Sequence, residues 1–425
     1  MGNNGFENIF KNVSNSDGFK ELLNKLKNVK EHNKDLFESE AFGELYEEIS
    51  AMMGKEVKPR ILMIGKTGVG KSSVLNALFG RSVFNIGVTP TTMEFDEQIW
   101  HTAKGDIIAI DAPGFSDPSK DANISGVNYD DAILDFAEKS GAHMALLVIK
   151  SDDRALEPEC QFLRKWHQRE NLRTFPIITV INQIDKMDPV QVWKPETINL
   201  ANPITKKSKN IRTYMDWVFS LDEFRALNMS DRIVAFAAPN PDPEDEEEEP
   251  RAPYNVELLK HKIYELLPVA AKTLFARAAK MQREEGERLV NYYAGGAAAA
   301  ILANPLPGSD FLSISAVQVA MTIHLGRLYN MEMTKQFAVS LLTPVLNSFA
   351  GRFLAQTIIS WIPGAKNFVG SPLAFGLTKV VGMSILSILS SGRDMEQITA
   401  EDIQNASKDI DFIECAKEYN SQSKD

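Results

Sequence analysis

Cysteine is scarce in this chain: only Cys160 and Cys415 occur among 425 residues. They lie far apart, and neither belongs to a spacing typical of metal ligands. A disulfide framework and a structural zinc site are therefore excluded as organising features, and a reducing compartment fits this composition. The first residues, Met1–Phe6, are polar and lack the apolar core of a signal peptide, which favours a cytoplasmic location.

Positive charge is also in short supply, with 46 Lys and Arg against 57 Asp and Glu and a net charge of -11. A general nucleic-acid binder is disfavoured, because phosphate binding needs clustered basic residues. The 44% hydrophobic and 24% charged content is ordinary for a folded protein. The length is too great for one ordinary core and predicts two or three structural units.

Long uninterrupted apolar runs are missing from the C-terminal half. Residues 290–391 are rich in small and aliphatic side chains, but no run is expected to reach the roughly 20 residues of a membrane span. The runs are interrupted by Arg327, Lys335, Arg352, Lys366, Lys379 and Arg393. A compact helical domain is therefore predicted.

Association of this half with a membrane is the alternative. Only Glu332 offsets the six basic residues, and such a bias attracts anionic lipid head groups. Gly370, Ala374 and Gly376 would permit close helix packing in lipid. Peripheral membrane association accordingly stays open beside the cytoplasmic location.

The chain does contain short apolar runs that alternate with helical patterns, at 61–64, 107–110, 145–149, 176–181 and 233–237. This alternation predicts an α/β fold with a parallel sheet and helices on both faces. Amphipathic helices are expected over 1–57, and a helix over 256–267 precedes Pro268. We therefore predict an N-terminal helical segment (1–57), a sheet domain (58–267, with an acidic loop at 239–253) and a C-terminal helical domain (268–425).

One motif follows the first strand at once: Gly65, Lys66, Thr67, Gly68, Val69, Gly70, Lys71 and Ser72 fit G-x-x-x-x-G-K-[ST] in full. Glycines let backbone N–H groups turn inward around phosphates, and the start of the next helix adds its positive dipole end. Lys71 can reach the β- and γ-phosphates. The Ser72 hydroxyl can hold Mg²⁺.

Three further segments follow in order. Val88–Thr92 lies between the first helix and the next strand. Asp111-Ala112-Pro113-Gly114 follows the strand 107–110, and an acid there is what a Mg²⁺ site requires. Asn182-Gln183-Ile184-Asp185 follows the strand 176–181. With these segments the chain resembles the small-GTPase superfamily, and within it the Era-like (TrmE-Era-septin) class, over roughly residues 58–267.

The resemblance implies a P-loop G domain with a mostly parallel six-stranded sheet, binding GTP or GDP with Mg²⁺. It implies that Asp185 selects guanine, with Asn182 and Gln183 in the same loop and Ser73 beside the phosphate loop. Ala237 and Ala238 lie where the family places a short base-contacting loop. The implied metal ligands are Ser72, Asp111 (through water) and Thr91, with Thr92 as the alternative to Thr91. Lys71, Thr91 and Gly114 are the implied catalytic residues, the Gly114 N–H sensing the γ-phosphate.

Several positions depart from the family pattern. Gln183 replaces a lysine, which predicts weaker nucleotide binding and the loss of a contact to the phosphate loop. Phe115 stands where many relatives place a water-orienting glutamine, and Gly68 where some carry an asparagine that binds potassium. We therefore expect slow hydrolysis, stimulated by a partner or by self-association. Arg154 is either a charge donor for this reaction or a loop arginine paired with its acidic neighbours.

The C-terminal half loosely resembles an uncharacterised helical domain that follows many Era-like GTPases. Its signature is a P-G-[SA]-[DK] turn, seen at 307–310 and 363–366, followed by an apolar helix such as 314–329. The whole layout is also similar to immunity-related and dynamin-like GTPases. We therefore expect a GTP-hydrolysing switch whose output is membrane association or formation of a homo-oligomer. A non-hydrolysing scaffold and a ribosome or RNA assembly factor are the alternatives.

Overall fold

The computed structural model describes residues 57–79, 96–102, 105–112, 129–226, 231–238, 252–303, 310–331, 338, 341–342, 370–393 and 397–422. The chain divides into two compact units, with the division between Ala279 and Lys280. The helices expected over 1–57, the two P-G turns and most of the acidic loop at 239–253 lie outside the described residues.

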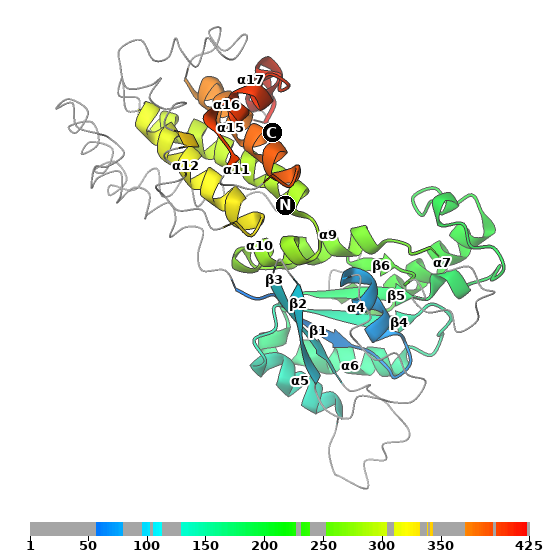
Figure 1. Cartoon of the computed structure of the whole chain (residues 1–425). Coiled ribbons are helices and arrows are strands. Elements are labelled where there is room, and N and C mark those ends of the chain that lie inside the picture. Colours follow the sequence, from blue (N-terminus) through cyan, green and yellow to red (C-terminus); the bar gives the residue numbers. More distant parts are fainter. Residues whose placement is uncertain are drawn as a thin grey trace. The chain divides into compact units, whose positions relative to one another are not determined.

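The unit Val57–Ala279 contains one six-stranded sheet. Its strands are β1 (Arg60–Ile64), β2 (Asp96–Thr102), β3 (Gly105–Asp111), β4 (Met144–Lys150), β5 (Ile177–Asn182) and β6 (Ile233–Ala235). The spatial order is β2-β3-β1-β4-β5-β6, and all neighbours are parallel except β2 and β3. The predicted mostly parallel six-stranded sheet is confirmed (Figure 1).

The helices of this unit are α4 (Lys71–Phe79), α5 (Tyr129–Lys139), α6 (Glu157–Gln168), α7 (Lys206–Ser220), α8 (Asp222–Ala226), α9 (Val256–Leu266) and α10 (Val269–Ala278). Short 3-10 helices cover Glu170–Leu172, Ile184–Lys186 and Pro195–Thr197. Because successive strand residues point to opposite faces, the buried strands are apolar throughout and need helices on both sides.

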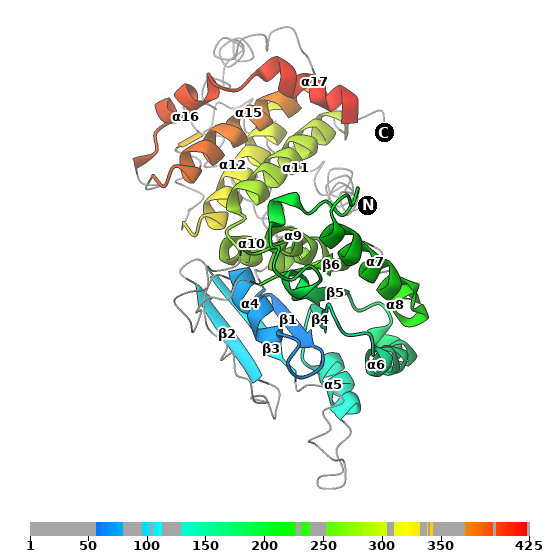
Figure 2. The same ribbon diagram turned by 90° about the vertical axis from the view of Figure 1, so that its right-hand side faces the viewer.

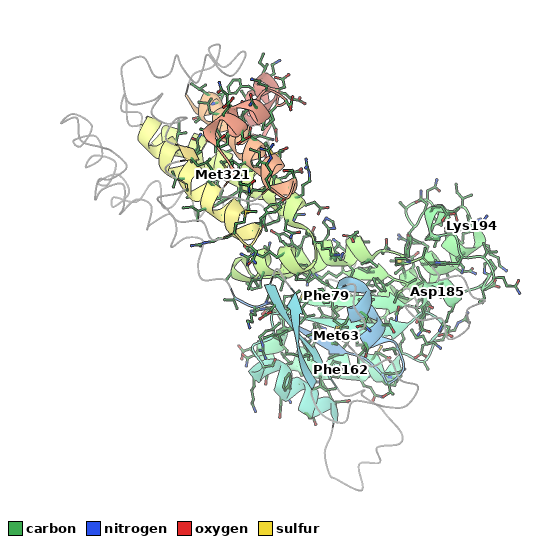
Figure 3. The ribbon with its side chains drawn as sticks, in the orientation of Figure 1. Met63, Phe79, Phe162, Asp185, Lys194 and Met321 are labelled. Carbon is green, nitrogen blue, oxygen red and sulfur yellow. The ribbon has the colours of Figure 1, made fainter. Side chains whose placement is uncertain are left out.

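One face of the sheet packs against α5, α6, α7 and α8, where Leu62 and Ile64 share a core with Phe162 and Trp166. The other face is covered by α4, α9 and α10. There Phe79 of α4 meets Phe275 of α10 edge to face, with ring centroids 6.3 Å apart. Figure 3 shows Met63 and Phe79 in this unit, with Asp185 at one edge of the sheet.

Helix α10 belongs to the sheet unit, whereas the sequence-based division at Pro268 assigns it to the C-terminal domain. The Val57 N–H donates to Ala270 O at 2.8 Å, and α10 contacts β3. The break between α10 and α11 comes only at Lys280, whose φ of 62° no helix can continue.

The second unit is helical, consisting in its described part of α11 (Gln282–Ala303), α12 (Asp310–Leu328), α15 (Ser371–Ser390), α16 (Ala400–Ser407) and α17 (Phe412–Gln422). Helix α15 contacts each of the other four (Figure 2). A Cβ added at Gly376 would lie 2.6 Å from the Phe412 ring, and one at Gly382 would lie 2.7 Å from Val290. Glycine therefore lets these helices approach closely.

Helix α15 corrects one expectation. It has 20 residues with a mean hydropathy of 1.7, so by length and composition it can cross a membrane, although no run of that length was expected. Most of it is buried inside the unit, as a core helix of a soluble protein also is. Its Lys379 is paired with Glu418, and Arg393, just beyond it, pairs with Asp402 at 2.7 Å. Acidic residues of α16 and α17 thus offset part of the basic bias seen in the sequence.

Candidate functional site

The loops that follow the parallel strands meet at one edge of the sheet, beyond the carboxyl ends. Ligands of open α/β sheets bind at this edge. Strand β1 is central, with β3 on one side and β4 on the other. Met63 is in register with Asp111, and Lys150 is in register with Asn182. The ends of the strands that lead into the phosphate loop, into the segment at Asp111 and into the segment at Asn182 are thereby brought to one edge of the sheet.

The loop between β1 and α4 wraps inward because three of its glycines take positive φ. Gly65, Gly68 and Gly70 have φ of 149°, 79° and 88°. A Cβ on Gly65 would lie 2.4 Å from Val148 O, and one on Gly70 would lie 2.5 Å from the Asn182 amide nitrogen. Only glycine satisfies both the backbone conformation and this close approach. The result is a cradle lined with backbone groups at the start of α4, the arrangement that binds phosphate.

Lys71 is the first residue of α4 and is 9% exposed. Its Nζ lies 3.2 Å from Gly65 O and 3.4 Å from Lys66 O, so the ammonium rests on the carbonyls of the loop itself. Ser72 and Ser73 follow in the first turn and are half-buried, while Thr67 and Gly68 are exposed and Val69 is buried. A buried cation over a glycine-rich loop suits a polyanionic ligand.

The loop after β5 lies against the phosphate loop. The Asn182 amide nitrogen donates to Val69 O at 3.0 Å. Gln183 takes a left-handed conformation with φ of 63°. Asp185 is 8% exposed, and Lys207 of α7 donates to its backbone oxygen at 2.7 Å. We call residues 182–185 the base loop.

Two buried oxygens at this point fit a polar ligand. Asn182 Oδ1 and Gln183 Oε1 are buried and have no hydrogen-bond partner among the described residues. Buried polar atoms normally have a partner, which a ligand with N–H donors can supply. The Gln183 amide nitrogen lies 3.6 Å from the position of a Cβ on Gly70. The side chain of Gln183 thus lies near Gly70, and the predicted loss of a lysine contact to the phosphate loop stays a prediction.

The remaining predicted residues are placed only in part. Asp111 ends β3 beside β1, but its side chain lies outside the described part of the structure, as do Thr91, Thr92, Gly114 and Phe115. Ala237 follows β6, is buried and bridges to Tyr254, and Ala238 is half-buried.

No group of three or more His, Cys, Asp or Glu side chains that could hold a metal ion occurs among the described residues. A magnesium ion bound to nucleotide phosphates needs only one or two protein carboxylates or hydroxyls and several waters. The predicted set of Ser72, Thr91 and Asp111 is of that kind.

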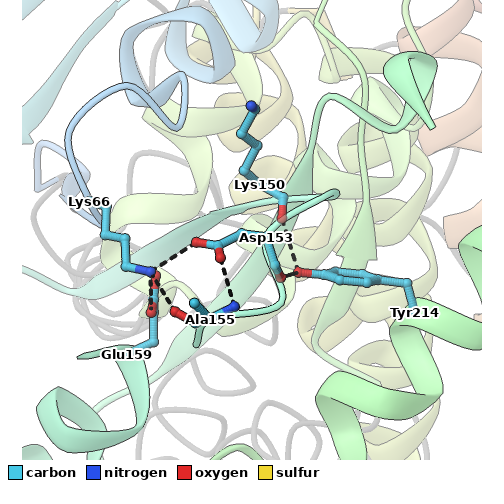
Figure 4. Close-up of polar contacts among 6 residues, drawn as sticks. All are labelled: Lys66, Lys150, Asp153, Ala155, Glu159 and Tyr214. Carbon is cyan, nitrogen blue, oxygen red and sulfur yellow. Dashed lines mark hydrogen bonds and ion pairs between the residues drawn. The ribbon is translucent and has the colours of Figure 1, made fainter. Parts of the chain in front are cut away.

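A cluster behind the phosphate loop was missed in the sequence. Lys66 contacts Asp153 and Glu159, and the loop that carries Asp153 also contacts Tyr214 (Figure 4). Glu159 is fully buried, and burial raises the pKa of its carboxyl, although Lys66 works against this. Burial by itself would lower the pKa of the Lys66 ammonium. The interactions with Asp153 and Glu159 outweigh burial, so the pKa is raised. No local pattern signals this cluster, since its members are far apart in the sequence.

Comparison with known families matches two parts of the chain. Residues 60–183 match a family described as 50S ribosome-binding GTPase. Residues 270–410 match a domain of unknown function, DUF697, in agreement with the resemblance to an uncharacterised helical domain.

The solved structures to which the chain is similar include Era, Toc33 and the G domain of FeoB. Era from Aquifex aeolicus is 20% identical, with 55% of this chain and 66% of that chain covered and a TM-score of 0.32. Toc33 from Arabidopsis thaliana, solved with GDP and Mg²⁺, is 17% identical, with 56% and 90% covered and a TM-score of 0.34. The G domain of the FeoB iron transporter of T. maritima is 20% identical, with 49% and 99% covered and a TM-score of 0.27. Similarities at this level give no basis for transferring a function.

Proposed function

Because the chain carries a GTP-binding GTPase domain in residues 60–183, we propose that it is a Mg²⁺-dependent molecular switch that hydrolyses GTP slowly. In this proposal, the bound nucleotide changes the contact between the G domain and the flanking helices. The observation that carries it is the cradle at the sheet edge, where Lys71 and the glycines of the phosphate loop lie against Asn182 of the base loop. Switch loops that are ordered by a γ-phosphate provide the two states.

Each residue of the cradle has a distinct task in this proposal. The Lys71 ammonium moves from the Gly65 and Lys66 carbonyls to phosphate oxygens and offsets their charge. The Asp185 carboxylate accepts hydrogen bonds from the guanine N1 and N2 groups, which adenine lacks. Ser72, Thr91 and Asp111 would hold Mg²⁺, which supplies charge stabilisation between the phosphates.

Slow turnover follows from Phe115, since a phenyl ring cannot orient a water molecule. Arg154 is the residue we propose to supply charge from one molecule to another. It is exposed and makes no hydrogen bond or ion pair with any described residue. Its acidic neighbours are engaged elsewhere: Asp153 pairs with Lys66 at 2.8 Å, and Asp152 pairs with Lys150 at 3.3 Å. These contacts favour the role of Arg154 as a charge donor over a local pairing with its acidic neighbours.

Calorimetry with Mg²⁺ and GTP, GDP or ATP tests the binding proposal, and uptake of guanine nucleotides in preference to ATP is expected. Single-turnover hydrolysis at rising protein concentration tests self-association, because a charge supplied by a second copy makes the rate concentration-dependent. Arg154→Ala should abolish that dependence, whereas Arg212→Ala, which removes a paired arginine of α7, should preserve it. Fast hydrolysis by dilute protein would contradict the proposal of slow turnover.

A non-hydrolysing, nucleotide-dependent scaffold is the second candidate, favoured by Gln183 and Phe115 at positions where active relatives carry other residues. Measuring the release of phosphate from GTP distinguishes this scaffold from the GTP-hydrolysing switch, because only the switch releases it. Vesicle flotation with a GTP analogue, GDP and no nucleotide decides whether the output is membrane association through the C-terminal helices.

A ribosome or RNA assembly role is the third candidate, suggested by the family description. The net charge of -11 argues against it, and a salt-sensitive RNA interaction would support it.

A further inference from the structure

The side chain of Lys66 points away from the phosphate loop that contains it. Its Nζ donates to Asp153 Oδ2 at 2.8 Å and to Ala155 O at 2.8 Å, and lies 3.0 Å from Glu159 Oε2 (Figure 4). Asp153 and Ala155 accept two of the three ammonium donors, and the buried Glu159 carboxylate adds an ion pair. Lys66 is therefore held by protein groups on the side away from the cradle.

Burial of the partner Glu159 makes its contact with Lys66 important for the folded structure. It lies in the first turn of α6 and is fully buried. A buried carboxylate that loses its partner leaves an uncompensated charge, so Lys66 is held firmly in place. Such pairs are weak evidence for stability, and one role suggested for them is to specify a geometry. The geometry specified here is the distance between the phosphate loop and the turn at residues 151–155.

The same turn contacts the base loop on its other side. The Ser151 N–H donates to Asn182 O at 3.0 Å, and Ser151 Oγ donates to Gln183 O at 2.8 Å. The turn is fixed from α7 as well, because the Tyr214 hydroxyl lies 3.0 Å from Lys150 O and 2.5 Å from Asp153 O. Lys66 is thus hydrogen-bonded to Asp153, the backbone of the turn leads from Asp153 to Ser151, and Ser151 is hydrogen-bonded to the base loop.

We propose that Lys66 is a positioning residue that sets the base loop relative to the phosphate loop through Asp153 and Ser151. The inference rests on the proposed binding of guanine nucleotides at this edge. Its consequence is specific: losing the Lys66 contacts displaces Asp185 from the base and reduces base selectivity, while the phosphate cradle still binds.

The test measures the dissociation constants of GTP and of ITP, whose base lacks the 2-amino group of guanine, in the full-length protein with Mg²⁺. The ratio of the two constants reports the base contact alone, since the phosphates are identical. Lys66→Ala and Asp153→Asn should lower the preference for GTP over ITP at least fivefold. Lys66→Arg should retain the preference, because a guanidinium can bridge both carboxylates.

Asp152→Asn is the matched control for Asp153→Asn. It changes the adjacent acid of the same turn, whose exposed side chain pairs only with Lys150 among the described residues. This variant should keep the wild-type ratio. Should Lys66→Ala fail to fold, the ratio of GTP to ITP affinity is measured in Asp153→Asn and Glu159→Gln instead, because both substitutions preserve side-chain volume.

Folded variants of Lys66 and Asp153 with the wild-type ratio of GTP to ITP affinity would overturn the inference and leave the proposed function intact. A wild-type protein that binds neither nucleotide would overturn the proposed function, and this inference with it.

Discussion

The carboxyl edge of the sheet and the helices α12 and α15 differ in their buried polar side chains. In the sheet unit, buried charged groups such as Lys71, Glu159 and Asp185 gather around the carboxyl edge of the sheet. In α12 and α15, the buried polar side chains are uncharged: Gln318, Thr322, Ser371, Thr378 and Ser384. Two of these hydroxyls donate to a carbonyl four residues earlier in their own helix, Thr322 to Gln318 O and Ser384 to Val380 O, both at 2.7 Å.

The difference shows which kind of burial signals a ligand. A hydroxyl that bonds within its own helix is satisfied locally and needs nothing further. Two buried amide oxygens without a partner among the described residues, Asn182 Oδ1 and Gln183 Oε1, are not in that condition. The sheet edge thus fits a polar ligand, whereas the hydroxyls of Thr322 and Ser384 are satisfied within their own helices. Substitutions in the two units should therefore affect different properties.

The largest expected effect is on nucleotide binding. Lys71→Ala removes the buried cation of the cradle, and losing one partner of such a charge contact costs about 3 kcal/mol, roughly a hundredfold in affinity. We expect a smaller effect on the temperature of unfolding, since the Lys71 ammonium lies 3.2 Å from Gly65 O and 3.4 Å from Lys66 O, and both are long hydrogen bonds. Calorimetry with GDP and a thermal melt measure the two properties.

Lys165→Ala is the control for this substitution, since Lys165 of α6 pairs with Asp130 at the surface. Surface pairs of this kind contribute about 0–1 kcal/mol. Equal GDP affinity in the two variants would remove the distinction drawn between the sheet edge and the rest of the unit.

Sequence patterns captured the sheet well where strands are buried on both faces. The apolar runs at 61–64, 107–110, 145–149 and 176–181 lie within two residues of the observed strand ends. Strand β2 was missed because its sequence, DEQIWHT, is polar and carries no apolar run. An edge strand that pairs antiparallel with β3 needs no such run, so nothing in the pattern revealed it.

Candidate site residues that belong to a motif could be proposed from the sequence, whereas those that folding brings in from elsewhere in the chain could not. The phosphate loop and Asn182–Asp185 follow strands at a recognisable spacing. Glu159 and Tyr214 reach the site only after folding, and neither belongs to a pattern. Helix α15 was underestimated for a related reason: Lys379 was counted as an interruption, although Glu418 from α17 neutralises it.

The second prediction concerns packing in the helical unit. A Cβ at Gly382 would lie 2.7 Å from Val290 and 2.8 Å from the Met321 sulfur. Gly382→Ala should therefore destabilise this unit by about 1–3 kcal/mol through overpacking. Chemical denaturation should show the loss, and GDP affinity should stay at its wild-type value.

Gly295→Ala is the matched control in α11. Nothing among the described residues lies within 4 Å of a Cβ placed there. Alanine should then stabilise the helix by about 0.5–1 kcal/mol, because glycine in a helix interior loses more conformational freedom on folding than alanine does. If both glycine variants were equally destabilised, close packing would not be the reason for Gly382.

The smallest expected effect concerns Asp402, at the start of α16. Thr399 and Asp402 form a capping box, and the Asp402 carboxylate also accepts from Arg393 at 2.7 Å. The hydrogen bonds from Thr399 and the Arg393 guanidinium lower the pKa of this carboxyl to about 2 from 3.8. Because the folded-state pKa is the lower one, the stabilisation is present in full above pH 3.8 and is lost as the pH falls towards 2.

At pH 5, the melting temperature of Asp402→Asn should accordingly be lower than that of the wild type. This difference in melting temperature should shrink as the pH is lowered from 3.8 towards 2. Thermal melts of both proteins between pH 5 and pH 2 measure it, provided that the rest of the chain stays folded. Glu401→Gln, an exposed acid of the same turn, is the control and should show no such convergence. Only the ionised carboxylate of Asp402 accepts hydrogen bonds from both Thr399 and Arg393. A difference in melting temperature between Asp402→Asn and the wild type that persists unchanged at pH 2 would therefore mean that the carboxylate does not stabilise the start of α16.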